Sequence, residues 1–440
     1  MTTATPLAAR PATEPAEPAD VTSAGTDAGP DAGPDAAERA APAGGRDPRR
    51  VLRAARDVAE DLAADAVARD RAGLPPSDET ARLREAGLPA ALVPPGRARG
   101  TDWRTGCAVV REIATADGSV GEVLARHYAH TWSGRFYGTG RQAAALERDS
   151  ARERWLWAGA VGGPGAPELT LTPRGAGHLL TGRAAVDTAV TVADVYVVDA
   201  VCAETGDLLV VRVRSGDPGV RAEPARDRLG QRVAGAGSVT FDGVAVSPGR
   251  VIGARPHDAE STAPFTALAG PALRLALCQV ALGVAEGALG EARDAVRSGP
   301  PPRRAPDPLR EPPPGPSPDR DPDLLLAYGE LASAARTAAA VVERATESMA
   351  NALEAGPHLD VDEPADVAAL VATAETVTAR AALHITTRVL ELADAPGLDR
   401  FWRDARVLTS HGSSTAHRLR DIGEHYLNGT YHRLTPAGGR

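Results

Sequence analysis

The chain changes its hydrophobic periodicity twice, and these changes divide it into three blocks. Over residues 49–150 apolar residues recur at helical spacing, as in VLRAARDVAEDLAADAVARD, which predicts a helical domain. Over residues 151–257 the pattern turns to short β-branched runs such as VTVADVYVVDAV and SVTFDGVAV, which predict a middle β domain. Residues 258–433 return to long, alanine-rich helical stretches. Four such helices at this spacing predict an antiparallel four-helix bundle, and the fold class is therefore α+β.

Three segments do not fit these periodic blocks. Residues 1–48 are rich in Ala, Pro, Asp and Gly and contain the repeat DAGPDAGPDA. Such a composition buries too little apolar surface to offset chain entropy, so we expect a disordered tail. Residues 299–322 carry eleven of the 37 prolines, which predicts an extended loop between two helices of the bundle. Residues 434–440 form a short C-terminal tail.

Composition excludes several classes of function. All 49 basic residues are arginine, so lysine Schiff-base chemistry and a P-loop are both excluded. The net charge of −9 argues against nucleic-acid binding by the chain as a whole. The cysteines Cys107, Cys202 and Cys278 are far apart and form no CxxC pair, so neither a disulfide framework nor a zinc site is expected. No apolar run approaches the roughly 20 residues that span a membrane, and no signal core is evident, so we expect a cytoplasmic protein without membrane partners.

Aromatic residues are scarce and unevenly placed. Ten of the fifteen lie in two segments, residues 127–157 and 401–431, where several histidines also gather. The functional interpretation is a flat, apolar pocket with a few polar groups. The alternative is that these side chains seal the joints between the three blocks.

Two short motifs have a structural interpretation beside a functional one, and a third has a structural interpretation alone. His127 and His130 are spaced i, i+3 and could chelate a metal, but no third ligand is suggested, and packed or capping histidines are favoured. Residues 138–143, GTGRQA, match the dinucleotide fingerprint GxGxxA without the preceding strand that gives it meaning. The break at residues 117–119, Asp-Gly-Ser, predicts a turn that caps the following helix.

Several motifs, together with the order of the blocks, resemble the acyl-CoA dehydrogenase superfamily. SVTFDGVAVSPGRVIG is similar to a characteristic F-D-x-V-x-V-P strand, and LDRFWRDARVLTSHGSSTAHRLRDIGEHYLNG is similar to the C-terminal motif. ADGSVGEVLARHYAHTW and GHLLTGRAAVDTAVTVADVYVV add weaker similarity. The resemblance implies a flavin between the β domain and the bundle. It also implies a homotetramer whose neighbouring subunits complete the flavin site.

The positions of the catalytic base separate the branches of this superfamily. A dehydrogenase needs a carboxylate to remove a weakly acidic α-proton. In the family it stands either after the R-D-A-R run, where this chain has His411 or Gly412, or before an arginine on the first bundle helix. The corresponding pair here is Leu273-Arg274. Both positions lack a carboxylate, and the D-R-F-W-R run from Asp399 resembles the two-component, dibenzothiophene monooxygenase-like branch.

This resemblance implies a flavin-dependent monooxygenase. Such an enzyme takes reduced FMN or FAD by diffusion from a separate reductase and uses O2 to oxygenate a small organic substrate through a C4a-hydroperoxyflavin. Two alternatives stay open: an acyl-CoA dehydrogenase or related flavin oxidase with its base elsewhere, and a degenerate, non-catalytic family member.

The resemblance also implies roles for individual residues. His411 is the candidate that hydrogen-bonds or protonates the bound oxygen, since an imidazole pKa near 6.5 permits either role, and His127 is the second catalytic candidate. An arginine suits a flavin phosphate because its guanidinium makes paired hydrogen bonds. For Arg403 and Arg406 the alternative is an ion pair with Asp399 or Asp404. No metal ligand is expected, and the cofactor-binding candidates are Tyr128, Trp157, Ala160, Gly162, Arg297, Arg403 and Arg406.

Overall fold

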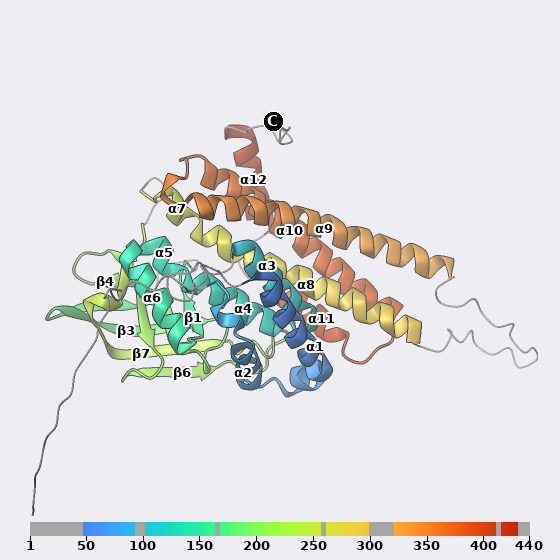
Figure 1. The fold of residues 1–440 in the computed structure, drawn as a ribbon, viewed down its shortest axis with the longest axis horizontal. Coiled ribbons are helices and arrows are strands. Elements are labelled where there is room, and N and C mark those ends of the chain that lie inside the picture. Colours follow the sequence, from blue (N-terminus) through green and yellow to red (C-terminus); the bar gives the residue numbers. More distant parts are fainter. Residues whose placement is uncertain are drawn as a thin grey trace, which may run out of the picture. The chain divides into compact units, whose positions relative to one another are not determined.

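The computed structural model describes residues 47–92, 102–162, 168–256, 261–298, 321–410 and 415–429. Most of the predicted segments 1–48 and 299–322, and all of 434–440, lie outside the described residues, as does His411. The described chain runs from helices through a sheet to a second set of helices (Figure 1). This order confirms the predicted α+β fold with an N-terminal helical domain, a middle β domain and a C-terminal helical domain.

The N-terminal helices start and stop at local signals in the sequence. Asp117 accepts a hydrogen bond from Val120 N (3.1 Å), so it caps the helix that begins at Gly118 as predicted. Thr139 and Gln142 form a capping box, which explains the GTGRQA motif as the start of a helix. The helices are α1 (Pro48–Ala72), α2 (Ser77–Glu85), α3 (Trp103–Ala116), α4 (Gly118–Thr131), α5 (Ser133–Tyr137) and α6 (Gly140–Glu153).

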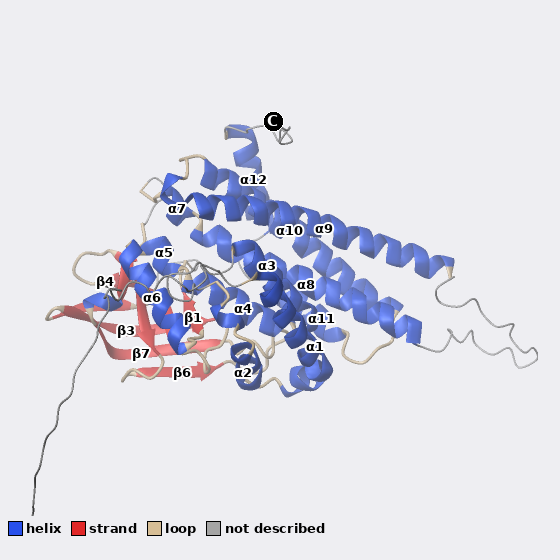
Figure 2. Ribbon diagram, viewed as in Figure 1, coloured by secondary structure: helices blue, strands red, loops and turns tan. Residues whose placement is uncertain are grey.

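The strands form one mixed sheet, set apart from the long C-terminal helices (Figure 2). Its order is β6-β7-β3-β2-β4-β5-β8, and β1 pairs with β4 in parallel. One cluster of buried apolar side chains, most of them from this sheet, forms the core of the β domain. The strands are β1 (Trp157–Ala160), β2 (Thr170–Arg174), β3 (Gly177–Val186), β4 (Val195–Cys202), β5 (Leu208–Arg214), β6 (Val220–Pro224), β7 (Gly237–Val246) and β8 (Val251–Ala254).

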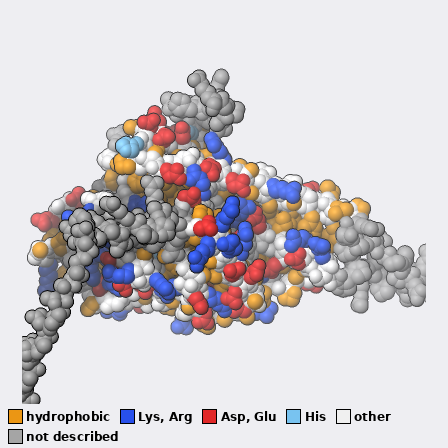
Figure 3. Space-filling view, viewed as in Figure 1, with side chains coloured by type: hydrophobic (Ala, Val, Ile, Leu, Met, Phe, Trp, Pro, Cys, Tyr) orange, Lys and Arg blue, Asp and Glu red, His pale blue; other side chains and the backbone are white. Residues whose placement is uncertain are grey.

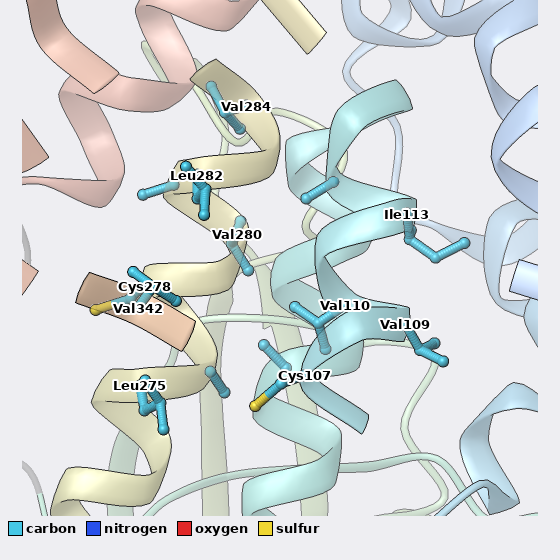
Figure 4. Packing of buried hydrophobic residues seen from close by; sticks show 14 of the residues in the cluster. Cys107, Val109, Val110, Ile113, Leu275, Cys278, Val280, Leu282, Val284 and Val342 are labelled. Carbon is cyan, nitrogen blue, oxygen red and sulfur yellow. The ribbon is translucent and has the colours of Figure 1, made fainter. Parts of the chain in front are cut away.

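The C-terminal domain shares its core with an N-terminal helix. Its helices are α7 (Pro264–Ala267), α8 (Ala269–Ser298), α9 (Pro322–Ala355), α10 (Glu363–Leu392), α11 (Asp399–Leu408) and α12 (Thr415–Asn428). Helix α8 packs against α10 and α3, and Figure 4 shows Cys107 and Val110 of α3 beside Val280 of α8. Helix α12, in contrast, buries only Arg418 among its residues. Helix α12 is therefore peripheral. The sequence pattern predicted a bundle of C-terminal helices only, whereas in the structure the N-terminal helix α3 also packs against α8.

One described helix is more apolar than the sequence analysis allowed. The segment Pro264–Ser298 contains an 18-residue window with a mean hydropathy of 1.6, long and apolar enough to cross a membrane. The expectation that no such run exists is therefore wrong. Of that window 67% is buried inside the fold, so its apolar composition is explained by packing within the helical core.

Candidate active site

A cavity of about 1240 Å³ lies where the three domains meet. Its walls come from α4 and α5 of the helical domain, the end of β1 and the loop after β3, and α8, α10 and α12 of the C-terminal domain. Ligand pockets usually measure roughly 300–1,000 Å³. The cavity therefore has room for a large cofactor and a small substrate together.

The end of β1 forms a wall of very small side chains. Gly159, Ala160 and Gly162 all line the cavity. A Cβ at Gly159 would overlap the carbonyl oxygen of Val197 on β4, so only glycine fits beside that strand. Gly162 has a φ of +75°, a conformation that glycine adopts without strain. The backbone of this segment can therefore approach a bound ligand closely.

A buried carboxylate holds the segment after β1 in place. Asp199 on β4 accepts a hydrogen bond from Gly162 N (2.8 Å), and Arg255 Nε lies 3.3 Å from the same carboxylate. Burial raises the pKa of Asp199, while Gly162 N and Arg255 lower it. Arg255 itself lines the cavity, so this ion pair links the rim of the cavity to the interior of the sheet.

Helix α4 contributes three polar side chains to another wall. Glu122, Arg126 and His130 are spaced four residues apart and line the cavity. Arg126 Nε donates to Glu122 Oε1 (2.7 Å), and Arg126 Nη1 lies 2.8 Å from Asp187 after β3. Burial, with Arg126 nearby, lowers the pKa of His130 to about 3. His130 is therefore neutral near pH 7, and its Nε2 has no hydrogen-bond partner among the described residues.

The C-terminal helices supply the remaining wall. Leu273, Arg274 and Leu277 face the cavity from α8, and Glu375 faces it from α10. Glu375 Oε1 lies 3.1 Å from Nη1 of the buried Arg418 on α12. Burial raises the pKa of Glu375, against the effect of this arginine. The ion pair therefore fastens α12 to α10 at the cavity.

A polar network behind α4 joins this wall to α11. Gln231 is fully buried, and its backbone N donates to Asp404 Oδ1 (2.6 Å). In the amide orientation that satisfies its neighbours, the Gln231 side chain donates to Glu122 Oε2 (2.8 Å) and Gly118 O (3.2 Å). Burial raises the pKa of Asp404 to about 8. Glu122, and through it Arg126, is thus positioned by residues from two other parts of the fold.

The structure does not support a catalytic role for His127. This side chain is fully buried and does not line the cavity. Its Nε2 lies 2.7 Å from Pro89 O, and its Nδ1 accepts a hydrogen bond from Trp157 N (3.0 Å). Both ring nitrogens are therefore engaged by the backbone, and burial lowers the pKa of His127 to about 4. The residue ties α4 to the start of β1.

Two of the predicted cofactor-binding aromatics are also structural. Tyr128 is buried and its hydroxyl donates to Leu88 O (2.8 Å). Trp157 is buried and its Nε1 donates to Ser150 Oγ (3.0 Å). Neither lines the cavity. These side chains follow the alternative interpretation, in which aromatics seal joints, whereas the nearby Phe136 and Tyr137 do line the cavity.

The other predicted residues lie in the cavity wall, in a partly buried ion pair, on the surface or outside the described residues. Ala160 and Gly162 line the cavity. Arg403 pairs with Asp70 (2.6 Å) and Asp399 (3.1 Å), which is the alternative that the sequence left open. Arg297 and Arg406 are exposed and outside the cavity wall of this chain. His411 lies outside the described residues, so its predicted role stays a prediction.

Sequence reasoning missed most of the charged residues of the cavity. On α4 the spacing of Glu122, Arg126 and His130 was a usable signal, because residues four apart share one helix face. Arg255 and Glu375 had no comparable signal, since only the folded chain brings them together. Among the described residues, no group of three or more His, Cys, Asp or Glu side chains could hold a metal ion.

Known proteins resemble this chain over most of its length. No family model matches it. A dibenzothiophene monooxygenase from Rhodococcus erythropolis is 30% identical over 396 residues, covering 86% of this chain and 93% of the relative. A probable FMNH2-dependent monooxygenase, SfnC from Pseudomonas putida, is 28% identical over 394 residues, covering 87% and 95%. The solved structure of TdsC from Paenibacillus sp. A11-2 with FMN and indole is 28% identical with a TM-score of 0.78, covering 86% and 97%.

Proposed function

This chain belongs to the dibenzothiophene monooxygenase family, and we propose that it takes reduced FMN from a separate reductase and oxygenates a small organic substrate in the cavity between β1, α4 and α8. The family makes it a flavin-dependent monooxygenase, an oxidoreductase with an acyl-CoA dehydrogenase-like fold. FMN rather than FAD, the reductase and the place of the substrate belong to the proposal. The names of SfnC and of the TdsC complex support the choice of FMN.

The cavity fits a flavin in size and in the chemistry of its walls. A planar ring system needs close, flat contact, and the small side chains of Gly159, Ala160 and Gly162 allow it. A phosphate needs a cation, and Arg255 stands at the rim beside Gly162. These four residues are the ones that would hold the cofactor.

The bound flavin would supply the two electrons with which O2 gives one oxygen atom to the substrate and the other to water. The protein's contribution is to exclude water and to fix charge. Phe136, Leu273 and Leu277 present apolar surface to the cavity, and a dry site limits unproductive loss of reduced oxygen. Arg126 lies within ion-pair distance of both Glu122 and Asp187 and fixes the position of these charged groups at the wall.

One observation argues most strongly for oxygenation over dehydrogenation. Leu273 faces the cavity at the position where the dehydrogenase base would stand before Arg274. The carboxylates that the described residues place in the cavity wall are Glu122, Asp187 and Glu375. Each of them lies within ion-pair distance of an arginine. The described part of the wall therefore offers no carboxylate free to remove a substrate proton.

The location and assembly of the protein are further parts of the proposal. We expect a cytoplasmic homotetramer, as the superfamily resemblance implies. Leu419 and Leu427 on α12 are 45% and 78% exposed, which fits burial of this helix against a second copy. Light scattering coupled to size-exclusion chromatography measures the mass of the full-length protein in solution. The mass of a monomer would contradict the proposed homotetramer. Figure 3 shows arginine side chains beside Asp and Glu side chains on the viewed face.

The test is oxygen transfer by the complete protein. The chain is loaded anaerobically with photoreduced FMN or FAD and mixed with isotopically labelled O2 and a panel of neutral and anionic organic sulfur compounds, amines and indoles. We expect one labelled oxygen atom in the product with reduced flavin and none with oxidised flavin. Tight binding of oxidised FAD with bleaching by acyl thioesters would instead support a dehydrogenase. Failure to bind either flavin in either redox state would support a non-catalytic relative.

A pair of variants tests whether the cofactor occupies this cavity. Ala160→Phe fills the wall beside β1, and we expect it to weaken binding of reduced FMN at least tenfold. Ala365→Phe adds the same bulk at an exposed position on α10 and serves as the matched control. Equal flavin affinity in the two variants would contradict the proposed location.

A further inference from the structure

Arg274 differs from the other buried or half-buried arginines in the cavity wall. Arg420 also lines the cavity, but it is exposed. Arg126, Arg255 and Arg418 each lie within ion-pair distance of a carboxylate. Arg274, on the second turn of α8, has no hydrogen bond or ion pair with any described residue, although it is half-buried and lines the cavity. Its charge therefore lacks a partner within the part of the chain that the structure describes.

Glu375, a carboxylate whose pKa Arg274 lowers, already forms an ion pair with Arg418. Glu375 on α10 is influenced by both Arg418 and Arg274, and both lower its pKa against the effect of burial. Arg418 makes the hydrogen bond to it, at 3.1 Å. Two guanidinium groups thus act on one carboxylate, so these three side chains together carry a net charge of +1. A half-buried cation without a partner has lost hydration that an arriving anion can replace.

The surroundings of Arg274 are open on one side and apolar on the other. A Cβ added at Gly270, one turn earlier on α8, would meet no atom within 4 Å. Leu273 and Leu277 flank Arg274 on the same helix, and Phe136 lines the cavity from α5. A ligand at this position would therefore contact the unpaired Arg274 cation and the apolar side chains beside it.

We propose that the substrate is an organic anion, with an apolar body and a carboxylate, sulfinate or sulfonate group that Arg274 binds. A guanidinium presents two parallel N–H donors to such a group, so the contact also orients the ligand. The proposal rests on the proposed function, because it names the class of molecule oxygenated at the same cavity. The alternative anion that Arg274 could bind is the phosphate group of the flavin.

The test compares matched anionic and neutral probes on the FMN-loaded full-length protein. Isothermal titration calorimetry gives the dissociation constants of benzenesulfinate and methyl phenyl sulfone, and of benzoate and benzamide. We expect each anion to bind at least about tenfold more tightly than its neutral partner. Arg274→Gln should abolish that preference and leave the neutral probes unchanged. Arg274→Lys keeps the charge and should retain part of the preference.

Controls separate this effect from folding and from the cofactor. Arg336→Gln removes the same charge at an exposed position on α9 and should behave as wild type. Each variant is also titrated with FMN and with riboflavin, which lacks the phosphate. If Arg274→Gln weakens FMN binding but not riboflavin binding, the cation serves the cofactor and the proposal is overturned.

Two further outcomes would also overturn it. One is equal binding of anionic and neutral probes by the wild type. The other is loss of both kinds of probe in Arg274→Gln with an unchanged melting temperature. Failure of the proposed function would look different, since no labelled oxygen would reach any substrate while anion-selective binding persisted.

Discussion

Asp404 makes the stability of the fold depend on pH in an unusual direction. This α11 carboxyl is buried and accepts the hydrogen bond from Gln231 N. Burial raises its pKa to about 8, although that hydrogen bond lowers it, while Asp117 and Asp70 raise it further. An unfolded aspartate has a pKa of about 3.9. Between about pH 4 and 8, the folded chain therefore binds a proton that the unfolded chain does not.

The sign and size of the effect follow from that difference. Because the folded state holds the extra proton, the contribution of Asp404 to the free energy of unfolding falls as pH rises. The slope is about 1.4 kcal/mol per pH unit while the folded carboxyl is protonated and the unfolded one is not. Between about pH 6.5 and 8 the loss is about 2 kcal/mol.

Two buried histidines act in the opposite sense at lower pH. Burial lowers the pKa of His127 to about 4 and that of His130 to about 3, against about 6.5 for an unfolded histidine. Between these folded and unfolded pKa values, the unfolded chain binds more protons than the folded chain. The free energy of unfolding therefore falls as the pH is lowered below about 6.5. A fall in the free energy of unfolding above about pH 6.5 can therefore be assigned to Asp404 and not to the two histidines.

Asp404→Asn isolates the contribution of Asp404. The asparagine keeps an acceptor for Gln231 N and does not titrate. Urea unfolding, followed by tryptophan fluorescence at one protein concentration, gives the free energy of unfolding at each pH. We expect the wild type to lose about 2 kcal/mol relative to this variant between about pH 6.5 and 8. Asp242→Asn, at a side chain that is 68% exposed, is the matched control and should follow the wild type.

Two results would refute this reasoning. In the first, the difference in unfolding free energy between wild type and Asp404→Asn stays constant over this pH range. In the second, the difference grows in favour of the wild type as pH rises. Either result would mean that Asp404 is ionised in the folded protein at pH 6.5.

Three further substitutions test local features by the same unfolding assay. Thr139→Ala removes the N-cap of α6 and should cost about 1 kcal/mol; no change would mean that the capping box contributes nothing. Gly159→Ala places a Cβ against the Val197 carbonyl and should cost about 1–3 kcal/mol and weaken flavin binding; wild-type values for both would contradict the close approach. His127→Phe leaves two buried backbone groups unpaired and should cost at least about 2 kcal/mol, whereas a large loss of oxygenation at unchanged stability would restore a catalytic role.

The sequence alone determined the elements and their order, because the forces that define them act over short distances. The caps at Asp117 and Thr139 need only a side chain and a backbone amide three residues away. The strands and helices can be predicted from the spacing of apolar residues along the chain. Pattern also separated the three domains, and motif similarity pointed to the flavin-dependent family.

Only the tertiary structure decided which side chains meet at the cavity. His127 and His130 stand one turn apart on α4, yet one ties two backbone segments together and the other lines the cavity. Arg255 and Glu375 come from distant parts of the chain and reach the same space through strand pairing and helix packing. The period of a helix shows which residues share a face, but what that face meets depends on how the whole chain buries its apolar surface.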